Sequence, residues 1–527
     1  MNKPLTDTDR KNLKQALGSE NVSEDDAARA FFSQDIWAKG KLADFIISPK
    51  TTEELSEAVK IAARAKIPLN PRGGGMSYTK GFIPSKEKTG ILDLSGMNEI
   101  LEINTDDMYV SVQAGVTWQQ LYEALKPHGV RTPFWGPLSG SRSTIGGGLS
   151  NNNAFFGAGT YGTSTQSVTS LTVVLADGSI VKTGTSGNRN GKPFYRHYGP
   201  DLTGLFLGDA GALAYKAEIS LRLIKTPPAE GFASFEFDDR DGWCNAHVEM
   251  GRLSLACELF GFDPNLQAVR MKRAGLASDV KSLANVITKQ KGGLIKGLKE
   301  GAKVALAGRK YMDDVAYSVH FMVEGHSLAE VDAKVDTLKE IAKSHGGKEI
   351  ENSIPKIMRA NPFGPLNSIL GPQGERWVPI HGIVPMGDGQ ACLKEIETLF
   401  SAMRDKLSDH EITVGYLLTT LSTNGLLIEP VFIWPEEIWA LHEDTVDASI
   451  LKRIKRFEKN PDATAVVEQA RQGILDVFSK YGAAHFQIGR TYPYRENRDD
   501  SAWKLLDDIK SVIDPNRTIN SGALGLD

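Results

Sequence analysis

Hydrophobic and polar residues alternate with changing periods along the first 230 positions, and the changes mark successive helices and strands. Thr51, followed by the early acidic residues Glu53 and Glu54, opens an amphipathic helix whose first turn is capped by the hydroxyl group. Short apolar runs bounded by turn residues predict strands. These runs lie at residues 67–69, 91–94, 109–112, 170–175 and 217–224, and a helix is predicted for Trp118–Leu125.

A glycine-rich segment from Asn70 to Gly81 directly follows the first of these strands. Its three consecutive glycines, Gly73, Gly74 and Gly75, carry no side chain that would block a ligand, and successive backbone amides can turn toward one anion. The segment has neither the G-x-G-x-x-G pattern of a nicotinamide site nor the G-K-[S/T] ending of a P-loop. It therefore predicts a diphosphate-binding loop of another kind, with a plain turn as the alternative.

A second stretch rich in glycine, serine and threonine covers residues 136–162. It shows no helical or strand period, and loops of this length are usually functional or disordered. Because a strong strand signal at residues 170–175 follows it at once, we expect an ordered functional loop.

The remaining chain divides at the proline pair Pro227-Pro228, where we place a domain boundary. Residues 1–44 are predicted to be polar helices that dock through aromatic and apolar residues. The other predicted elements are strands at 376–385 and 426–434 and a helix at 461–481, which returns the chain to the first domain.

Composition describes an ordinary globular enzyme. The chain has 527 residues, 41% of them hydrophobic and 24% charged, and a net charge of −4, which gives no reason to expect a nucleic-acid partner. Three cysteines are too few for a disulfide scaffold. The polar first twenty residues argue against a secretory signal, and no apolar stretch reaches about 18 residues. We therefore expect a cytoplasmic protein.

One segment departs from this even charge distribution. Residues 270–310 contain eleven Lys or Arg residues against Asp279 and Glu300, with apolar residues near helical spacing. Such a segment is typical of a membrane-surface or acceptor-protein contact, which would place the protein peripherally at the inner face of the membrane. The alternative is a solvated helix pair. A homodimer is also left open.

Several motifs, taken in order, resemble the FAD-binding fold of the vanillyl-alcohol oxidase and p-cresol methylhydroxylase family. The specific similarity covers residues 40–228, and the last fifty residues add to it. The motifs are Pro71 to Ser77, Val112 to Thr117, Thr144 to Gly148 with Tyr161-Gly162, Val173 to Gly178, Tyr198 to Gly211 and Asp514 to Gly522.

The resemblance implies an α+β protein with a two-part FAD-binding domain and an inserted cap domain built on an antiparallel sheet. We place the FAD-binding domain at residues 1–228, the cap, or substrate, domain at 229–455 and a returning C-terminal segment at 456–527. The residues implied to wrap the FAD diphosphate and flank its ring are Pro71, Arg72, Gly73, Gly74, Gly75, Met76, Ser77, Pro137, Ser139, Ser143, Thr144, Gly147, Gly148, Asn151, Tyr161, Gly162 and Asn520. Some relatives tether the flavin through a histidine at the position of Met76, so we expect noncovalent FAD.

Five residues are candidates for the chemistry of C–H oxidation, which needs a proton acceptor and positive charge near the substrate. Tyr78 follows the glycine loop, where relatives place an active-site tyrosine. His381, on a predicted strand, is the first candidate base, and a buried structural histidine is the alternative. His485, Arg490 and Tyr492 lie in one run that, as a strand, would send several side chains to one face. Arg490 would bind a carboxylate, or else form a structural salt bridge.

Departures from the family count against both a phenolate pocket and a metal-assisted hydroxy-acid mechanism. Phenol-oxidising relatives use a Tyr-Arg pair where this chain has Phe486-Gln487, and the metal motifs of flavin 2-hydroxy-acid dehydrogenases are missing, so no metal site is predicted. The leading hypothesis is hydride transfer from an alcohol or a 2-hydroxy acid to flavin N5. The alternatives are oxidation of para-substituted phenols or benzylic alcohols, and a docked electron-transfer flavoprotein.

Overall fold

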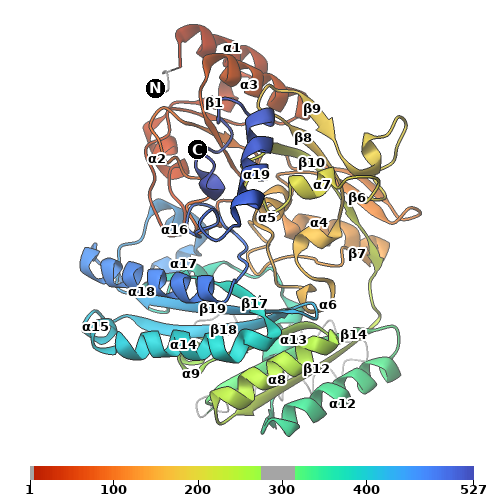
Figure 1. The fold of residues 1–527 in the computed structure, drawn as a ribbon, viewed down its shortest axis with the longest axis vertical. Helices are drawn as coiled ribbons and strands as arrows, with labels where there is room; N and C mark the ends of the chain where they lie inside the picture. The colour runs from red at the N-terminus through yellow and green to blue at the C-terminus, as the bar shows by residue number, and fades with distance from the viewer. Residues whose placement is uncertain (1–4, 275–314) are drawn as a thin grey trace. The chain divides into compact units, whose positions relative to one another are not determined.

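The computed structural model describes residues 5–274 and 315–527, which form two compact units (Figure 1). The first unit comprises Met1–Ala154, Thr163–Thr226 and His485–Asp527, and the second comprises Phe155–Gly162 and Pro227–Ala484. The break at Thr226 lies two residues from the predicted boundary. The return lies at His485 rather than at residue 456, because helix α18 (Pro461–Lys480) packs within the second unit.

The first unit begins with helices packed around a small mixed sheet, in which β1 (Val22–Ser23) pairs antiparallel with β2 (Ile46–Ile47). Its strands β2 and β3 (Leu69–Arg72) run parallel to β4 (Gly90–Asp93). Helix α3 (Thr52–Ala65) is capped by the Thr51 hydroxyl, which accepts a hydrogen bond from the Glu54 amide. The other elements of this layer are α1 (Asp7–Leu17) and α2 (Asp26–Phe32).

An antiparallel five-stranded sheet forms the other layer of the first unit, in the order β5-β6-β10-β8-β9. Its central strands β8 and β10 are almost fully buried, in agreement with their β-branched and apolar sequences. The element bounds are β5 (Ile100–Asn104), β6 (Tyr109–Gln113), α4 (Trp118–Leu125), β8 (Val168–Val174), β9 (Ile180–Lys182) and β10 (Tyr215–Arg222), with a separate pair β7 (Val130–Arg131) and β11 (Ile224–Lys225).

The C-terminal segment completes the first unit. Helix α19 (Asp500–Ile513) leads to residues 518–520, which lie beside β3: the Leu69 amide donates to the Thr518 carbonyl, and the Asn520 amide donates to the Leu69 carbonyl. The strand that carries the glycine loop is therefore held by the far end of the chain.

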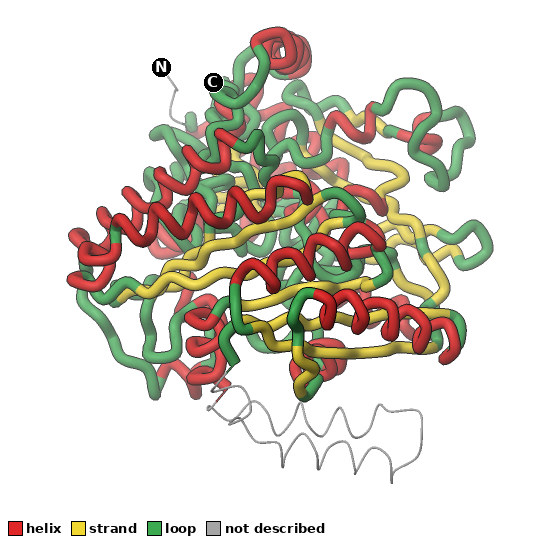
Figure 2. The backbone as a smooth tube through the Cα atoms, turned by 60° about the horizontal axis from the view of Figure 1, so that its bottom comes forward, coloured by secondary structure: helices red, strands yellow, loops and turns green. Residues whose placement is uncertain are grey.

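The second unit is built on an antiparallel eight-stranded sheet in the order β15-β12-β14-β13-β18-β19-β16, with β17 also pairing with β19. Helices α12, α8, α14 and α18 follow one another along this sheet (Figures 1 and 2). The strands are β12 (Ala229–Phe237), β13 (Ala256–Phe262), β14 (Tyr317–Gly325), β15 (Lys348–Ile350), β16 (Arg376–Pro379), β17 (Gly382–Pro385), β18 (Thr413–Leu421) and β19 (Gly425–Trp434), and the helices α6 (Ala158–Tyr161), α8 (Arg240–Leu253), α9 (Pro264–Ala274), α12 (Leu328–Ser344), α13 (Ser353–Ala360) and α14 (Gly389–Ala402).

The α+β class and the antiparallel-sheet second domain predicted from the sequence are confirmed, and most of the predicted strands form, although the strand predicted at 67–69 is β3 at Leu69–Arg72. The expectation of one long loop at residues 136–162 is wrong, because this stretch forms the short helices α5 (Ile145–Asn151) and α6. The predicted strand at 376–385 is two strands, interrupted at Ile380 and His381.

The structure says little about two further sequence predictions, both of which concern membranes or partners. Most of the basic segment at residues 270–310 lies outside the described residues, so membrane or partner docking stays a prediction. Among the helices that the structure describes, none combines the length and apolar character required to cross a membrane.

Candidate functional site

The loop at residues 73–77 presents a row of backbone donors. Within the described part of the chain, the amides of these five consecutive residues have no hydrogen-bond acceptor. Gly75 has a φ of +73°, a conformation that suits glycine. Consecutive amides of this kind are what a diphosphate group requires, so the donor set fits the diphosphate of FAD.

A second loop, residues 137–144, packs directly against the first. A Cβ atom on Gly73 would lie 2.2 Å from the Thr144 hydroxyl oxygen, and one on Gly74 would lie 2.0 Å from the Arg142 carbonyl oxygen. The Arg142 Nε donates to the Gly74 carbonyl at 3.0 Å. Ser139 and Ser143 hold the second loop in shape through a hydroxyl pair at 2.6 Å. The two loops therefore form one structure, which we call the glycine cradle (residues 73–77 and 137–144).

Helix α5 continues from the cradle and explains why its glycines form a helix. Thr144 caps it by accepting a hydrogen bond from the Gly147 amide at 3.3 Å. A Cβ on Gly146 would lie 2.7 Å from the Ala114 Cβ, and one on Gly148 would lie 2.8 Å from the Trp118 Nε1. Close packing of the helix backbone thus overrides the low helix propensity of glycine.

Arg72 supports the glycine loop from beneath. The side chain is buried, and its guanidinium carbon lies 4.4 Å from the ring centroid of Phe32, with the rings of Phe31 and Phe82 also near. A Cβ on Gly75 would lie 2.4 Å from the Arg72 Nη2. The positive charge is therefore fixed under the loop amides, where it adds to their attraction for an anion.

Tyr78 ends the glycine loop in contact with the C-terminal segment. The Gln487 side-chain amide donates to the Tyr78 phenolic oxygen at 3.3 Å, and the Gln487 backbone amide donates to the Asn151 carbonyl at 2.7 Å. The Asn151 side chain donates to the Gly147 carbonyl. Gln487 thus joins the loop tyrosine to the end of helix α5.

His485 and Tyr492 lie against each other, with ring centroids 4.2 Å apart and an interplanar angle of 21°. The run from 485 to 494 forms turns, not the strand that would send several side chains to one face. The reason is visible at Gln487 and Gly489, which have φ values of +51° and +54°. His485 and Tyr492 therefore pack on each other, whereas Gln487 and Arg490 contact other parts of the chain.

The guanidinium group of Arg490 is hydrogen-bonded to other groups of the protein. Its Nη1 donates to the carbonyls of Lys80, Gly81 and Ile83, and its Nη2 donates to the Asn520 side chain and the Ser521 carbonyl. Burial lowers the pKa of Arg490 to about 10, so the side chain is still charged near neutral pH. Arg490 is therefore a structural arginine. Its N–H donors are largely used by these contacts with the protein and are not directed at a substrate carboxylate.

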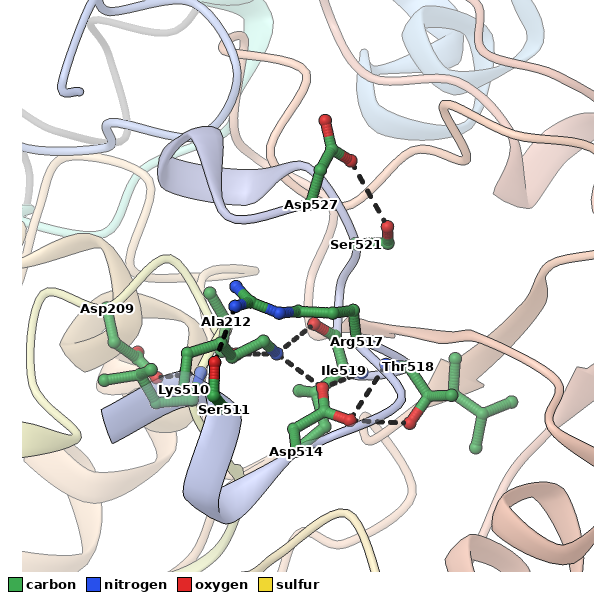
Figure 3. A network of polar contacts seen from close by, with 12 residues as sticks. Asp209, Ala212, Lys510, Ser511, Asp514, Arg517, Thr518, Ile519, Ser521 and Asp527 are labelled. Carbon is green, nitrogen blue, oxygen red and sulfur yellow. Dashed lines mark hydrogen bonds and ion pairs between the residues drawn. The ribbon is translucent and has the colours of Figure 1, made fainter. Parts of the chain in front are cut away.

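Asn520 crosses the same region by donating to the carbonyls of Gly81 and Ala210. Nearby, the fully buried Lys510 binds the Asp514 carboxylate and donates to the carbonyls of Ala212 and Ile519 (Figure 3). Asp514 also accepts from the amides of Thr518 and Ile519. This network fixes the segment that pairs with β3.

The structure places the remaining candidates in the second unit. His381 is fully buried between β16 and β17. Tyr161 ends helix α6, and Gly162 follows it with a φ of +75°. Gln487 and Arg142 were missed as site residues. Gln487 belonged to the alternating run of His485, Arg490 and Tyr492 but was not chosen as a site residue, and no local pattern indicated that Arg142 would contact Gly74.

Among the described residues, no three His, Cys, Asp or Glu side chains are arranged to hold a metal ion. The three cysteines, all within the described part of the chain, are buried and form no disulfide bond.

Comparison with known proteins agrees with this geometry. A family model described as an FAD binding domain matches residues 43–184, which include the whole glycine cradle. Among solved structures, p-cresol methylhydroxylase aligns over 99% of this chain and 96% of its own, with a TM-score of 0.75 and 18% identity. The 4-ethylphenol oxidase from Gulosibacter chungangensis aligns over 98% of this chain and 97% of its own, with a TM-score of 0.71 and 16% identity.

Curated relatives share more sequence over a shorter region. Glycolate oxidase subunit GlcD of Bacillus subtilis is 33% identical over 224 residues, which are 42% of this chain and 46% of that protein. D-lactate dehydrogenase [cytochrome] 1 of Saccharomyces cerevisiae is 33% identical over 235 residues, 43% of this chain and 38% of its own. The chain thus spans less than half the length of these relatives. Residues 43–184 thus match an FAD binding domain, and the chain has the fold of p-cresol methylhydroxylase.

Proposed function

We propose that this protein is an FAD-dependent oxidoreductase that removes hydride from the hydroxyl-bearing carbon of a 2-hydroxy acid or an alcohol. The names of its curated relatives, a glycolate oxidase subunit and a D-lactate dehydrogenase, support this substrate class. The similarity covers less than half of each relative, so the substrate class is carried over as part of the proposal.

The observation that carries the proposal is the set of acceptor-free amides at residues 73–77, held in place by the second loop of the cradle. These amides, with the Arg72 charge beneath them, would hold the FAD diphosphate. Bound FAD would supply the two-electron acceptor for the reaction.

The chain's own contribution begins with Tyr78. Gln487 donates to the phenolic oxygen, which restricts the position and the rotation of the Tyr78 hydroxyl group. A hydroxyl fixed in this way orients a bound polar group better than a freely rotating one, because its rotational entropy is already restricted.

A second candidate function is oxidation of a para-substituted phenol or benzylic alcohol. It is favoured by the fold similarity to p-cresol methylhydroxylase and 4-ethylphenol oxidase, which extends over almost the whole chain. Against it, Phe486 and Gln487 stand where phenol-oxidising relatives carry a Tyr-Arg pair.

The test is an anaerobic absorbance titration of the FAD-loaded protein. One series uses D- and L-2-hydroxy acids, and the other uses 4-alkylphenols and benzylic alcohols. Bleaching of the flavin band by hydroxy acids supports the leading proposal. Bleaching by phenols alone transfers the assignment to the second candidate, and bleaching by neither series rejects both.

A further inference from the structure

The eight-stranded sheet of the second unit carries charged groups on one face. Helix α8 covers the other face, since a Cβ on Gly261 would meet the side chains of Trp243 and His247. Side chains alternate along a strand, so Phe260 and Phe262 point away from α8. We call the side to which they point the Phe262 face.

The strand register places four residues in one row across this face. Phe262 pairs with Ser318 on β14 and with Leu417 on β18, and Leu417 pairs with Glu429 on β19. The neighbouring row contains His320, Phe260 and Thr419. Aromatic rings and a carboxylate therefore share one surface of the sheet.

Helix α9 adds a positive charge to the same face. Leu266 of α9 lies against Gly415, two residues before Leu417 and therefore on the same side of β18. From the next turns of this helix, the Arg270 guanidinium lies over the Phe262 ring, 4.2 Å from its centroid. Arg270 and Glu429 are close enough to influence each other's pKa, but the described residues show no hydrogen bond or direct ion pair between them.

This arrangement is unfavourable without a further partner. Glu429 stands in the apolar run of β19, where burial raises its pKa to about 7, and burial lowers the pKa of Arg270 to about 10. Both groups are partly buried, and no carboxylate or guanidinium of the described residues forms an ion pair with either. Charges in such surroundings are generally paired, and unpaired ones are concentrated at functional sites.

Among the described residues, the other charged groups near this face are already neutralised or uncharged. His320 accepts or donates hydrogen bonds with Ser234 and Ser318, and burial together with Arg270 lowers its pKa to about 3. Arg359 binds the carboxylates of Glu230, Glu258 and Glu324. Of the described residues, Arg270 is thus the cation that a bound anion would meet in the row of Phe262.

We propose that Arg270 binds the carboxylate of an anionic substrate and that Glu429 accepts a hydrogen bond from its hydroxyl group. The rings of Phe260 and Phe262 would receive an apolar or aromatic side chain, so the substrate class is a 2-hydroxy acid with a bulky apolar substituent. The inference rests on the proposed function, and it moves the anion-binding role from Arg490 to Arg270.

The first experiment measures binding without any reaction. Phenylacetate and its neutral amide are titrated calorimetrically into the FAD-loaded protein, the Arg270→Gln variant and the control Arg252→Gln, which alters an exposed arginine on α8. Loss of a charged hydrogen-bond pair should weaken phenylacetate binding about ten- to a hundredfold. Binding of the amide should change much less, whereas a structural defect would weaken both ligands.

Arg270→Lys provides a second variant that retains the charge. It should weaken phenylacetate binding several-fold, less than Arg270→Gln, because a lysine lacks the planar two-pronged donor. Equal acid-to-amide ratios in all variants, or no phenylacetate binding to the unaltered protein, would overturn the inference.

Glu429→Gln tests the hydroxyl contact. It should leave phenylacetate binding within about twofold and weaken mandelate, which adds the hydroxyl, by about five- to tenfold, with Glu340→Gln on the exposed side of α12 as control. An equal effect on both ligands rejects the Glu429 contact. If no hydroxy acid bleaches the flavin but the binding of phenylacetate still depends on Arg270, the proposed function is rejected and the anion-binding site is retained.

Discussion

The side-chain amide of Gln487 lies 3.3 Å from the phenolic oxygen of Tyr78, although 409 positions separate the two residues in sequence. The same glutamine binds the end of helix α5 through its backbone amide, at a φ of +51° that is uncommon for a residue with a side chain. The C-terminal segment therefore does more than close the fold, because it sets the position of the tyrosine beside the glycine loop.

Replacing Gln487 with alanine should lower the rate of flavin reduction about three- to tenfold, since one hydrogen bond to the tyrosine is lost. FAD content should stay unchanged, because the cradle lies on other residues. Stopped-flow reduction with the best donor of the titration measures the rate. Gln472→Ala, on the exposed surface of α18, is the matched control. An unchanged rate in Gln487→Ala would assign the contact to structure alone.

Gly74→Ala should remove most of the bound FAD. The added Cβ would lie 2.0 Å from the Arg142 carbonyl oxygen, so the two loops of the cradle must separate. Overpacking of this kind costs about 1–3 kcal/mol and displaces the amides from their common direction. The ratio of flavin to protein absorbance after purification reports the loss.

Gly96→Ala is the control for this change, because its Cβ would approach nothing closer than 3.7 Å. Full FAD occupancy in Gly74→Ala would contradict the assignment of residues 73–77 to the diphosphate.

The Lys510–Asp514 pair should matter far more to stability than a similar pair nearby. Both side chains are completely buried, whereas Lys504 and Asp508 form an exposed pair with the same spacing. Asp514→Ala leaves a buried lysine without its partner and should lower the free energy of unfolding by about 3–5 kcal/mol. Asp508→Ala should lower it by less than about 1 kcal/mol. Denaturant titration distinguishes the two, and equal effects would contradict the burial argument.

His320 should make the protein sensitive to mild acid. Its pKa is about 3 in the folded protein against an ordinary value of 6.5, so the unfolded chain binds a proton that the folded protein does not. Stability is therefore lost as pH falls below about 6.5, by about 2 kcal/mol at pH 5.

The His320→Gln variant removes this titration. The difference between its free energies of unfolding at pH 7 and pH 5 should be smaller by about 2 kcal/mol than in the unaltered protein. His247, whose burial lowers its pKa to about 4, retains part of the acid sensitivity. Tryptophan fluorescence follows the transition through the buried Trp243 and Trp434. An unchanged pH dependence would show that His320 is protonated in the folded protein.

Much of the fold follows from local sequence. The runs around Ile91, Val110, Val173 and Ile219 became strands because β-branched residues bounded by turns suit a buried sheet. Helix α5 could not be predicted, because its three glycines disfavour a helix by themselves. It forms where Ala114 and Trp118 leave room only for a bare backbone, and that condition arises from residues in other elements.

The candidate site, too, was predictable in part from local sequence and in part depended on contacts between distant residues. The glycine loop was visible as three consecutive glycines after a strand. The roles of Arg490 and Gln487 depended on positive backbone φ values at Gln487 and Gly489, which turn a predicted strand into a series of turns. The Arg270–Glu429 arrangement required the register of three strands, and no spacing along the chain encodes it.

The dependence of β3 on residues 518–520 has a consequence for biosynthesis. Gly81 and Asn520 are 439 positions apart. At translation speeds of about 5–20 residues per second, Asn520 is synthesised roughly 20–90 s after Gly81. Until residues 518–520 have been synthesised, the edge of β3 beside Leu69 lacks its partner. FAD loading is thus expected only after residues 518–520 have left the ribosome, and nascent chains stalled within the second unit should carry no flavin.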